Sequence, residues 1–193
     1  MTEPVLLDNP WITRRKLDVH EYHRMGEAGI FVGKKRVELI EGELIEMSAI
    51  GSFHSGTINR LNRLLVTAVG TQAVVAVQNP VRLDDFSEPE PDFALLRPRD
   101  DDYTTAVPTV SDVLLLVEVA DSSLRYDRAV KLPLYGRHGI PEVWIVDLER
   151  LQVEVCRGPA AKGYSSVAHL GAGSSVQPLL LPGVVLRVDS FLR

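Results

Sequence analysis

The sequence predicts a mixed α/β or α+β fold, and three observations support this prediction. Residues 113–119 and 142–147 form two apolar runs of the length of buried strands. The segment between them has a helical pattern, and a short helical crossover between two apolar strands is typical of a parallel, right-handed strand pair. The tail from residue 150 onward has short apolar stretches separated by glycine and proline, which favours antiparallel strands. We therefore expect a mixed central sheet.

The first part of the chain predicts a helix, a hairpin and a longer helix. Apolar residues near helical spacing indicate a helix over 18–28. Residues 37–40 and 43–47 read as a β-hairpin, because Gly42 between them can adopt the positive φ of a tight turn. A longer helix is predicted over about 53–70. Its apolar face consists of Ile58, Leu61, Leu65 and Val69.

Further strands are expected on both sides of the crossover. Before the two apolar runs, strands are predicted at 73–77, 80–84 and 92–96. The crossover helix should extend from about 126 to 137, but Pro133 inside a helix costs about 3 kcal/mol. We therefore expect that helix to start late or to bend at Pro133. The tail strands are predicted at Leu151–Cys156, Ser165–His169, Val176–Leu181 and Val184–Val188.

Charge and hydropathy restrict the function classes. The net charge of −5 argues against tight non-specific binding of nucleic acid over a broad surface. No apolar run approaches the roughly 18 residues that span a bilayer, and residues 1–8 lack the features of a signal peptide, so we expect a cytoplasmic protein without a membrane partner. A local basic groove stays possible, although a solvated surface is the simpler interpretation. Its candidates are Arg60, Arg63, Arg97, Arg99, Arg125, Arg128, Lys131 and Arg137.

A glutamate in the middle of an apolar strand is the most informative single residue. Glu118 lies among Leu116, Val117 and Val119. An ionised carboxylate in an apolar interior needs a partner, a metal or a proton. Glu118 is also close to the carboxyl end of its strand, where open α/β sheets place their active sites. The alternative is a buried glutamate that an arginine neutralises.

Other candidate residues are ambiguous when each is taken alone. Asp92 could be a turn acid, and Lys131 could form an exposed ion pair with Asp127 four residues earlier. His54 at the start of a helix is more often structural, and Glu41 lies in a hairpin turn. Two carboxylates suit a hard cation such as Mg²⁺ or Mn²⁺. The sequence has no phosphate-binding glycine loop, no His-Glu-x-x-His and no Cys-x-x-Cys.

An ordered set of short segments carries a family resemblance. The segments are residues 38–47, His54, Pro91-Asp92, residues 117–119, 126–128, 131–135, 139–147 and 181–184. With these segments in this order, from about residue 17 to the C-terminus, the chain resembles the Uma2 family (DUF820) of endonucleases. That family lies within the PD-(D/E)XK restriction-endonuclease-like superfamily.

The resemblance implies a restriction-endonuclease-like αβββαβ core with a mixed central sheet. The core would cover about 36–148 of a single domain, 1–193, with an N-terminal extension (1–35) and C-terminal strands (149–193). An N-terminal helix and hairpin and antiparallel C-terminal strands would accompany the core. It makes Asp92 and Glu118 metal ligands, with the Val119 carbonyl as a third.

The resemblance also assigns the catalytic lysine. The superfamily motif has lysine two residues after the glutamate, where this chain has Ala120. In Uma2-like sequences the lysine has moved to the following helix, which makes Lys131 the candidate. Glu41 and His54 match recurrent family positions, and Glu41 could bind a second metal or position the first.

The function implied is a Mg²⁺-dependent (or Mn²⁺-dependent) endonuclease acting on DNA, with a homodimer as a plausible assembly. An alternative from another class is a nuclease-like fold without catalysis that binds nucleic acid or protein. A third is a hydrolase for another phosphate ester that uses the same metal site.

Overall fold

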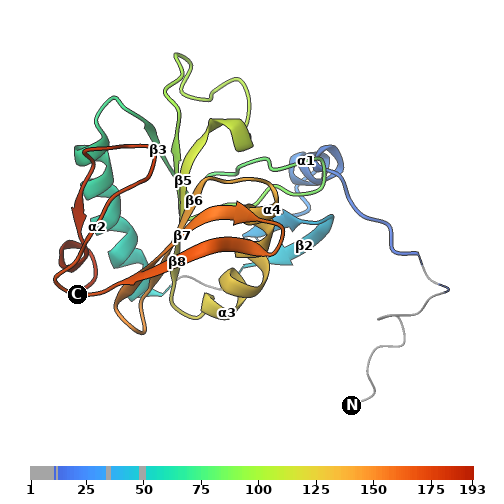
Figure 1. Cartoon of the computed structure of the whole chain (residues 1–193). Coiled ribbons are helices and arrows are strands. Elements are labelled where there is room, and N and C mark those ends of the chain that lie inside the picture. The colour runs from blue at the N-terminus through green and yellow to red at the C-terminus, as the bar shows by residue number, and fades with distance from the viewer. Residues whose placement is uncertain (1–10, 12, 34–35, 48–50) are drawn as a thin grey trace.

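The computed structural model describes residues 11, 13–33, 36–47 and 51–193, so parts of the expected N-terminal extension lie outside the described residues. Figure 1 shows a central sheet in the order β3-β4-β5-β6-β7-β8. Strands β5 and β6 are parallel, and every other neighbouring pair in this sheet is antiparallel. The mixed sheet with one parallel pair is therefore confirmed. Its strands are β3 (Val74–Val77), β4 (Phe93–Leu96), β5 (Val113–Ala120), β6 (Glu142–Asp147), β7 (Gln152–Ala160) and β8 (Gly163–Leu170).

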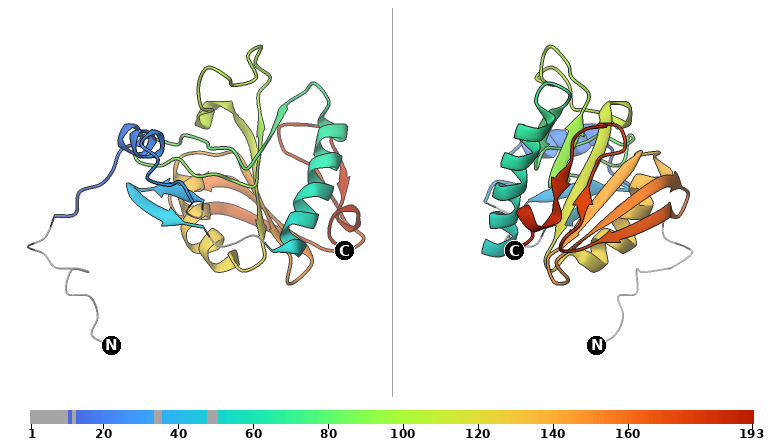
Figure 2. Two further views of the ribbon diagram at one scale, coloured as in Figure 1. Left: turned by 180° about the vertical axis from the view of Figure 1, so that it is seen from behind. Right: turned by 60° about the vertical axis from the view of Figure 1, so that its left-hand side comes forward.

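Helices cover the sheet from both sides. Helix α2 (Ser52–Val69) packs on one face, and the crossover between β5 and β6 lies on the other (Figure 2). The crossover consists of α3 (Leu124–Tyr126), a π-helical turn (Asp127–Lys131) and α4 (Leu132–Arg137). With α2, β3, β4, β5, the crossover and β6 in this order, the αβββαβ core is present. None of the helices in the described residues is long and apolar enough to cross a membrane.

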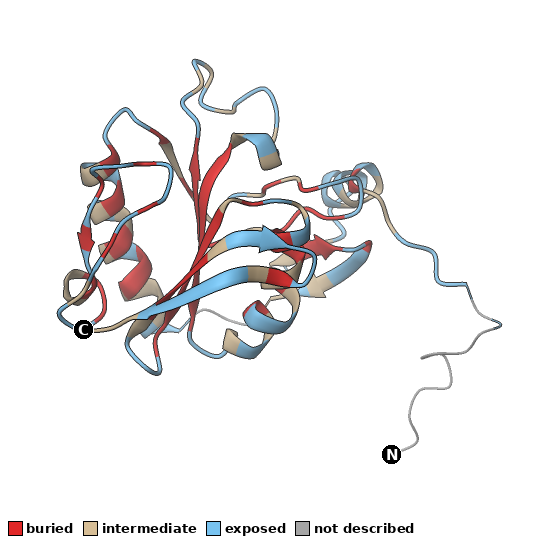
Figure 3. Cartoon of the chain, in the orientation of Figure 1, coloured by how far each residue is buried: buried red, intermediate tan, exposed pale blue. Residues whose placement is uncertain are grey.

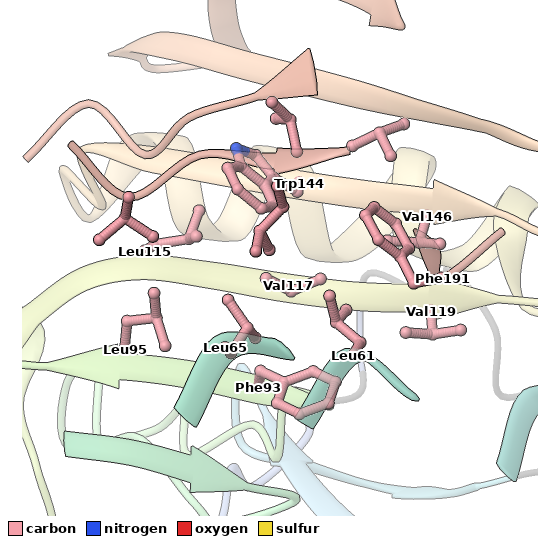
Figure 4. Packing of buried hydrophobic residues seen from close by; sticks show 14 of the residues in the cluster. Leu61, Leu65, Phe93, Leu95, Leu115, Val117, Val119, Trp144, Val146 and Phe191 are labelled. Carbon is pink, nitrogen blue, oxygen red and sulfur yellow. The ribbon is translucent and has the colours of Figure 1, made fainter. Parts of the chain in front are cut away.

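Side chains on β5 alternate between two different environments. Leu115, Val117 and Val119 point into the core that includes α2 and the C-terminal tail (Figure 4). Leu116 belongs to the core under α4 instead, and Glu118 lies on that same face because side chains alternate along a strand. Every residue of β5 is buried, as the red strand in Figure 3 shows. Glu118 is thus carried into the interior on the crossover side.

The crossover contains a wide turn that accommodates its proline. Pro133 has no N–H and its ring would clash with the carbonyl of Ala129 in a regular α-helix. The chain instead forms the π-helical turn just before it, and the Leu132 N–H bonds to the Asp127 carbonyl five residues earlier. Single π-helical turns inside helices are frequent at functional sites. The expected disturbance at Pro133 is therefore present, as a wider turn that contains Lys131.

The N-terminal hairpin packs on the crossover side of the sheet, in the same core cluster as Leu116. Helix α1 (Val19–Glu27) starts with a capping box made by Asp18 and Glu21. The hairpin of β1 (Val37–Ile40) and β2 (Glu43–Glu46) turns at Glu41 and Gly42, both with positive φ. The hairpin is anchored by β1, whose Leu39 carbonyl accepts a hydrogen bond from the Glu88 amide at 2.8 Å.

Two predictions about strands are wrong. Residues 80–84 form no strand, although Val81 and Leu83 alternate as buried positions. Their amides bond to the nearby Pro89 and Ser87 carbonyls, and Arg82 makes only an isolated bridge.

The first two tail strands are confirmed as β7 and β8, but the last two are much shorter than expected, since β9 is Ser175–Val176 and β10 is Leu186–Arg187. Pro178 and Pro182 interrupt this region, since proline cannot donate to a strand ladder.

Candidate active site

A cavity of about 290 Å³ opens at the carboxyl end of β5. Its lining comes from β2, the start of α2, the residues before β4, the end of β5 and the crossover. Asp92, Glu118, Val119, Lys131 and His54, all predicted from the sequence, are among the lining residues. Five residues from four separate segments of the chain therefore meet in one place.

Asp92 precedes β4 and is fixed by hydrogen bonds to both carboxylate oxygens. The Val119 amide donates to Oδ2 at 2.8 Å, and the Gln78 side-chain amide donates to Oδ1 at 3.1 Å. The Nε2 atom of His54 lies 3.2 Å from the same Oδ1. Burial by itself would raise the pKa of Asp92, but these hydrogen bonds and the charge of His54 outweigh burial and lower it. Asp92 is thus held as a carboxylate in one orientation.

Glu118 is bound through one of its two oxygens. Its Oε1 accepts a hydrogen bond from the Tyr135 hydroxyl at 2.6 Å and lies 3.2 Å from Lys131 Nζ. Its Oε2 receives no hydrogen bond from the described residues and is not among the fully enclosed unpaired atoms. Since Glu118 lines the cavity, Oε2 is the oxygen available to a ligand there.

Lys131 is completely enclosed between two glutamates. Its Nζ lies 3.0 Å from Glu38 Oε1 and 3.2 Å from Glu118 Oε1, and the side chain is 1% exposed. Glu38 comes from β1, so the hairpin supplies the second carboxylate. The Glu38 Oε1 atom also accepts the Glu90 amide at 3.1 Å, whereas its Oε2 is buried without a partner in the described structure.

The pKa shifts follow from this arrangement. Burial raises the pKa of Glu118 to about 8, although Lys131 opposes the shift. Burial would lower the pKa of Lys131, but the charges of Glu118 and Glu38 outweigh it and hold that pKa well above its usual range. Lys131 is therefore held as an ammonium ion, and burial favours a proton on Glu118 even beside that charge, as long as no metal ion is bound.

A third carboxylate of the cavity comes from the π-helical turn. Asp127 is 2% exposed and accepts a hydrogen bond from the Ser123 hydroxyl at 2.7 Å. Burial raises the pKa of Asp127 to about 6, while Lys131 opposes the shift. The exposed Asp127–Lys131 ion pair that the spacing suggested is not observed, since both side chains are buried. The hydroxyl of Tyr126, beside Asp127 in the chain, is buried without a partner among the described residues.

His54 and Glu41 have different placements. Burial would lower the pKa of His54, but its hydrogen bond to Asp92 and the charge of Asp92 raise it, and the main chain of Val119 contributes in the same sense. Glu41 lies outside the cavity. Its half-exposed carboxylate pairs with Arg137 at 2.7 Å, on a surface that it shares with Asp84 and His138. The hairpin turn directs Glu41 away from the site, and Glu38 of the same hairpin reaches it instead.

Three residues of the site were missed in the sequence. The sequence patterns assign no individual role to Glu38, Tyr135 or Gln78. The sequence indicates burial of Glu38 only weakly, by its place in a predicted strand directly after the apolar Val37. Of the eight basic residues proposed for a groove, Lys131 is the one that lines the cavity in the described part of the chain.

The side chains fit a hard divalent cation with few protein ligands. Six lining residues are acidic, and Arg36 and Lys131 are basic. The described residues contain no group of three or more His, Cys, Asp or Glu side chains that could hold a metal ion. Mg²⁺ usually keeps several waters and needs only one or two carboxylates, so the free Oε2 of Glu118 beside Asp92 suits it. The six acidic residues are Glu46, Glu90, Asp92, Glu118, Asp121 and Asp127.

Known families and structures include relatives of this chain. The model of the Uma2 family, described as "Putative restriction endonuclease", matches residues 19–189. Among solved structures, the chain is similar to a protein from Anabaena variabilis ATCC 29413 described as "a putative nuclease belonging to DUF820". The two are 17% identical, with a TM-score of 0.65 over 81% of this chain and 89% of that one. No curated protein matches the sequence. The structural similarity supports the restriction-endonuclease-like fold.

Proposed function

The chain belongs to the Uma2 family, and we propose that it is a Mg²⁺- or Mn²⁺-dependent endonuclease that hydrolyses phosphodiester bonds of DNA. One observation carries this proposal. Asp92, Glu118 and Lys131, which come from three separate segments of the chain, line a single cavity at the carboxyl end of β5. Two acids and a lysine are the side chains that metal-assisted hydrolysis of a phosphodiester requires.

Asp92 and Glu118 are the proposed side-chain ligands of the cation, with the Val119 carbonyl as a third oxygen. When bound, such a cation polarises a phosphoryl oxygen and lowers the pKa of a bound water. The hydrogen bonds from Val119 N–H, Gln78 and His54 hold Asp92 in place for this role. The Tyr135 hydroxyl does the same for Glu118, because it leaves Oε2 free toward the cavity.

Lys131 acts as a fixed positive charge in this proposal. Its ammonium group lies between the Glu38 and Glu118 carboxylates, which raise its pKa, so we assign it no role as a general base. Its ammonium group can orient the attacking water and stabilise the negative charge that develops on the phosphate. Glu38 is a positioning residue for Lys131, because its Oε1 lies 3.0 Å from the ammonium group that also contacts Glu118.

The acidic lining distinguishes catalysis from simple binding. A nuclease-like fold that only binds nucleic acid would meet a phosphate with basic groups, as phosphate contacts usually do. Here acidic residues outnumber basic ones in the cavity, so a phosphate is attracted only when a cation is present. This favours the enzyme over the binding module. Cutting both strands of a duplex would suit a two-fold homodimer.

A cleavage assay tests the proposal. Single- and double-stranded DNA would be incubated with wild type, Glu118→Gln and Lys131→Ala, each with Mg²⁺, with Mn²⁺ and with EDTA. We expect metal-dependent cleavage by wild type and a loss of about a thousandfold or more in both variants. Absence of cleavage by wild type with either metal, or equal cleavage by the variants, contradicts the enzyme proposal. Cleavage of a simple phosphodiester but not of DNA would support the other phosphate-ester hydrolase.

A further inference from the structure

Gln78 has an unusual backbone for its residue type. It follows β3 directly, and its φ of 53° lies in the left-handed region that favours glycine. Side chains other than glycine, asparagine and aspartate adopt this conformation rarely because of steric conflict with the backbone. A glutamine there costs conformational energy that a glycine would not. Such strain is often found next to functional sites, where the side chain has a role that offsets it.

The side chain of Gln78 has one partner among the described residues, the carboxylate of Asp92. Its Nε2 lies 3.1 Å from Asp92 Oδ1, and its main-chain amide donates to the Asp92 carbonyl at 3.1 Å. The geometry follows from the strand register, in which Val77 of β3 faces Phe93 of β4. Gln78 and Asp92 are the next residues beyond that pair. The left-handed turn at Gln78 therefore keeps its side chain at the level of Asp92.

Gln78 approaches Asp92 from behind the cavity. Asp92 is among the residues that line the cavity, whereas Gln78 is absent from that lining. Two donors on Oδ1, from Gln78 and His54, and one donor on Oδ2, from Val119, fix the carboxylate plane. Outer partners of this kind orient metal-binding carboxylates in proteins, and their loss weakens metal binding.

We propose that Gln78 is a positioning residue that fixes the Asp92 carboxylate for cation binding, and that its strained backbone is retained for this purpose. This inference rests on the proposed function, because it needs Asp92 to be a metal ligand. It predicts that stability and metal affinity respond differently to substitution at this position. Glycine removes both the strain and the amide group, whereas alanine removes the amide group and keeps the strain.

The test is direct titration of each protein with Mn²⁺, in which the free ion is followed by its electron paramagnetic resonance signal. Gln78→Gly and Gln78→Ala should both bind Mn²⁺ about 10–100-fold more weakly than wild type. The melting temperature of Gln78→Gly should stay within about 2 °C of wild type, since relief of strain offsets the lost hydrogen bond. Gln78→Ala should melt lower than Gln78→Gly.

Leu151→Gly is the matched control. Leu151 also has a left-handed backbone, with φ of 51°, but it lies in the turn between β6 and β7, away from the cavity. Its replacement should leave Mn²⁺ affinity unchanged. If wild type binds Mn²⁺ and Asp92→Ala does not, the metal site stands. Equal affinity of wild type and Gln78→Gly in that case overturns the inference alone. Absence of Mn²⁺ binding by wild type overturns the proposed metal site and the inference with it.

Discussion

Two buried glutamates in neighbouring strands have opposite surroundings. Glu118 is near the end of β5, and one of its oxygens, at the cavity, receives no hydrogen bond from the part of the chain that the structure describes. Glu142 starts β6, and both its oxygens are bonded within the protein. Its Oε1 accepts from Trp144 Nε1 and from Arg157 Nε, each at 2.9 Å, and its Oε2 accepts the Leu179 amide.

The comparison shows that burial of a charged residue does not by itself indicate catalysis. Both glutamates lie in apolar runs and are almost inaccessible to solvent. What separates them is the number of hydrogen bonds that the fold supplies. Glu142 joins the sheet to the C-terminal tail and leaves nothing for a ligand. Glu118 receives fewer hydrogen bonds, and it lines a cavity that Asp92 also lines.

The largest effect in this comparison is expected when Glu142 is replaced. Glu142→Ala leaves the partly buried Arg157 guanidinium and the Trp144 N–H without their acceptor. We expect a loss of about 3–5 kcal/mol in the free energy of unfolding, measured by urea denaturation. Cleavage per folded molecule should stay close to wild type. A large loss of cleavage in protein shown to be folded would mean that the two glutamates are not separate in role.

The pH dependence of stability sharpens the same contrast. The pKa of Glu118 is raised from 4.5 to about 8, so its proton stabilises the folded state. This contribution is complete below the ordinary pKa and is lost as the pH rises through the folded value. Between about pH 5 and pH 9 in EDTA, wild type should lose on the order of 3 kcal/mol more stability than Glu118→Gln, which has no proton to release. Parallel curves for the two proteins would contradict the raised pKa.

Divalent cations should stabilise the protein through the site of Glu118, and not through Glu142. At about ten times its dissociation constant, Mg²⁺ should add about 1.4 kcal/mol to wild type and raise its melting temperature by about 3–5 °C. The Asp92→Ala variant should show no such shift, whereas Glu142→Gln should keep it. Thermal melting followed by circular dichroism measures all three. Equal shifts in wild type and Asp92→Ala would contradict the assignment of Asp92 as a metal ligand.

The smallest effect is expected at Glu41. Its ion pair with Arg137 is exposed, and exposed pairs contribute about 0–1 kcal/mol. Glu41→Gln should therefore change stability by less than about 0.5 kcal/mol and leave cleavage unchanged. Glu38→Gln, in the same hairpin, is the informative companion, since it removes a charge that Lys131 contacts. Loss of cleavage in Glu41→Gln would mean that Glu41 takes part in the reaction after all.

Much of the fold could be predicted because its signals are local. The apolar runs of β5 and β6 with a helix between them indicate a parallel pair, and the helical spacing from Ile58 to Val69 indicates α2. Residues 80–84 show the limit of such patterns. Alternation of Val81 and Leu83 reports burial, but strand pairing depends on a neighbour that the sequence does not reveal.

The candidate site could be predicted in part for the same reason. Asp92, Glu118 and Lys131 lie next to recognisable elements, and the structure places them around one cavity. Glu38 could not be assigned, because its contact with Lys131 joins positions 93 residues apart and depends on how the hairpin docks. For the same reason, the sequence pointed to Glu41 although Glu38 is the hairpin residue at the site. Residues three apart in a hairpin can face opposite surroundings.

The pairing of Glu38 with Lys131 also has a consequence for how the protein matures. During synthesis the hairpin leaves the ribosome long before the crossover does. Until Lys131 arrives, a docked Glu38 would be a buried carboxylate with no cation beside it, which is strongly unfavourable. The hairpin should therefore dock late, as a closing step that follows assembly of the sheet and crossover. An unfinished chain would then lack both the hairpin wall of the cavity and the ammonium group of Lys131.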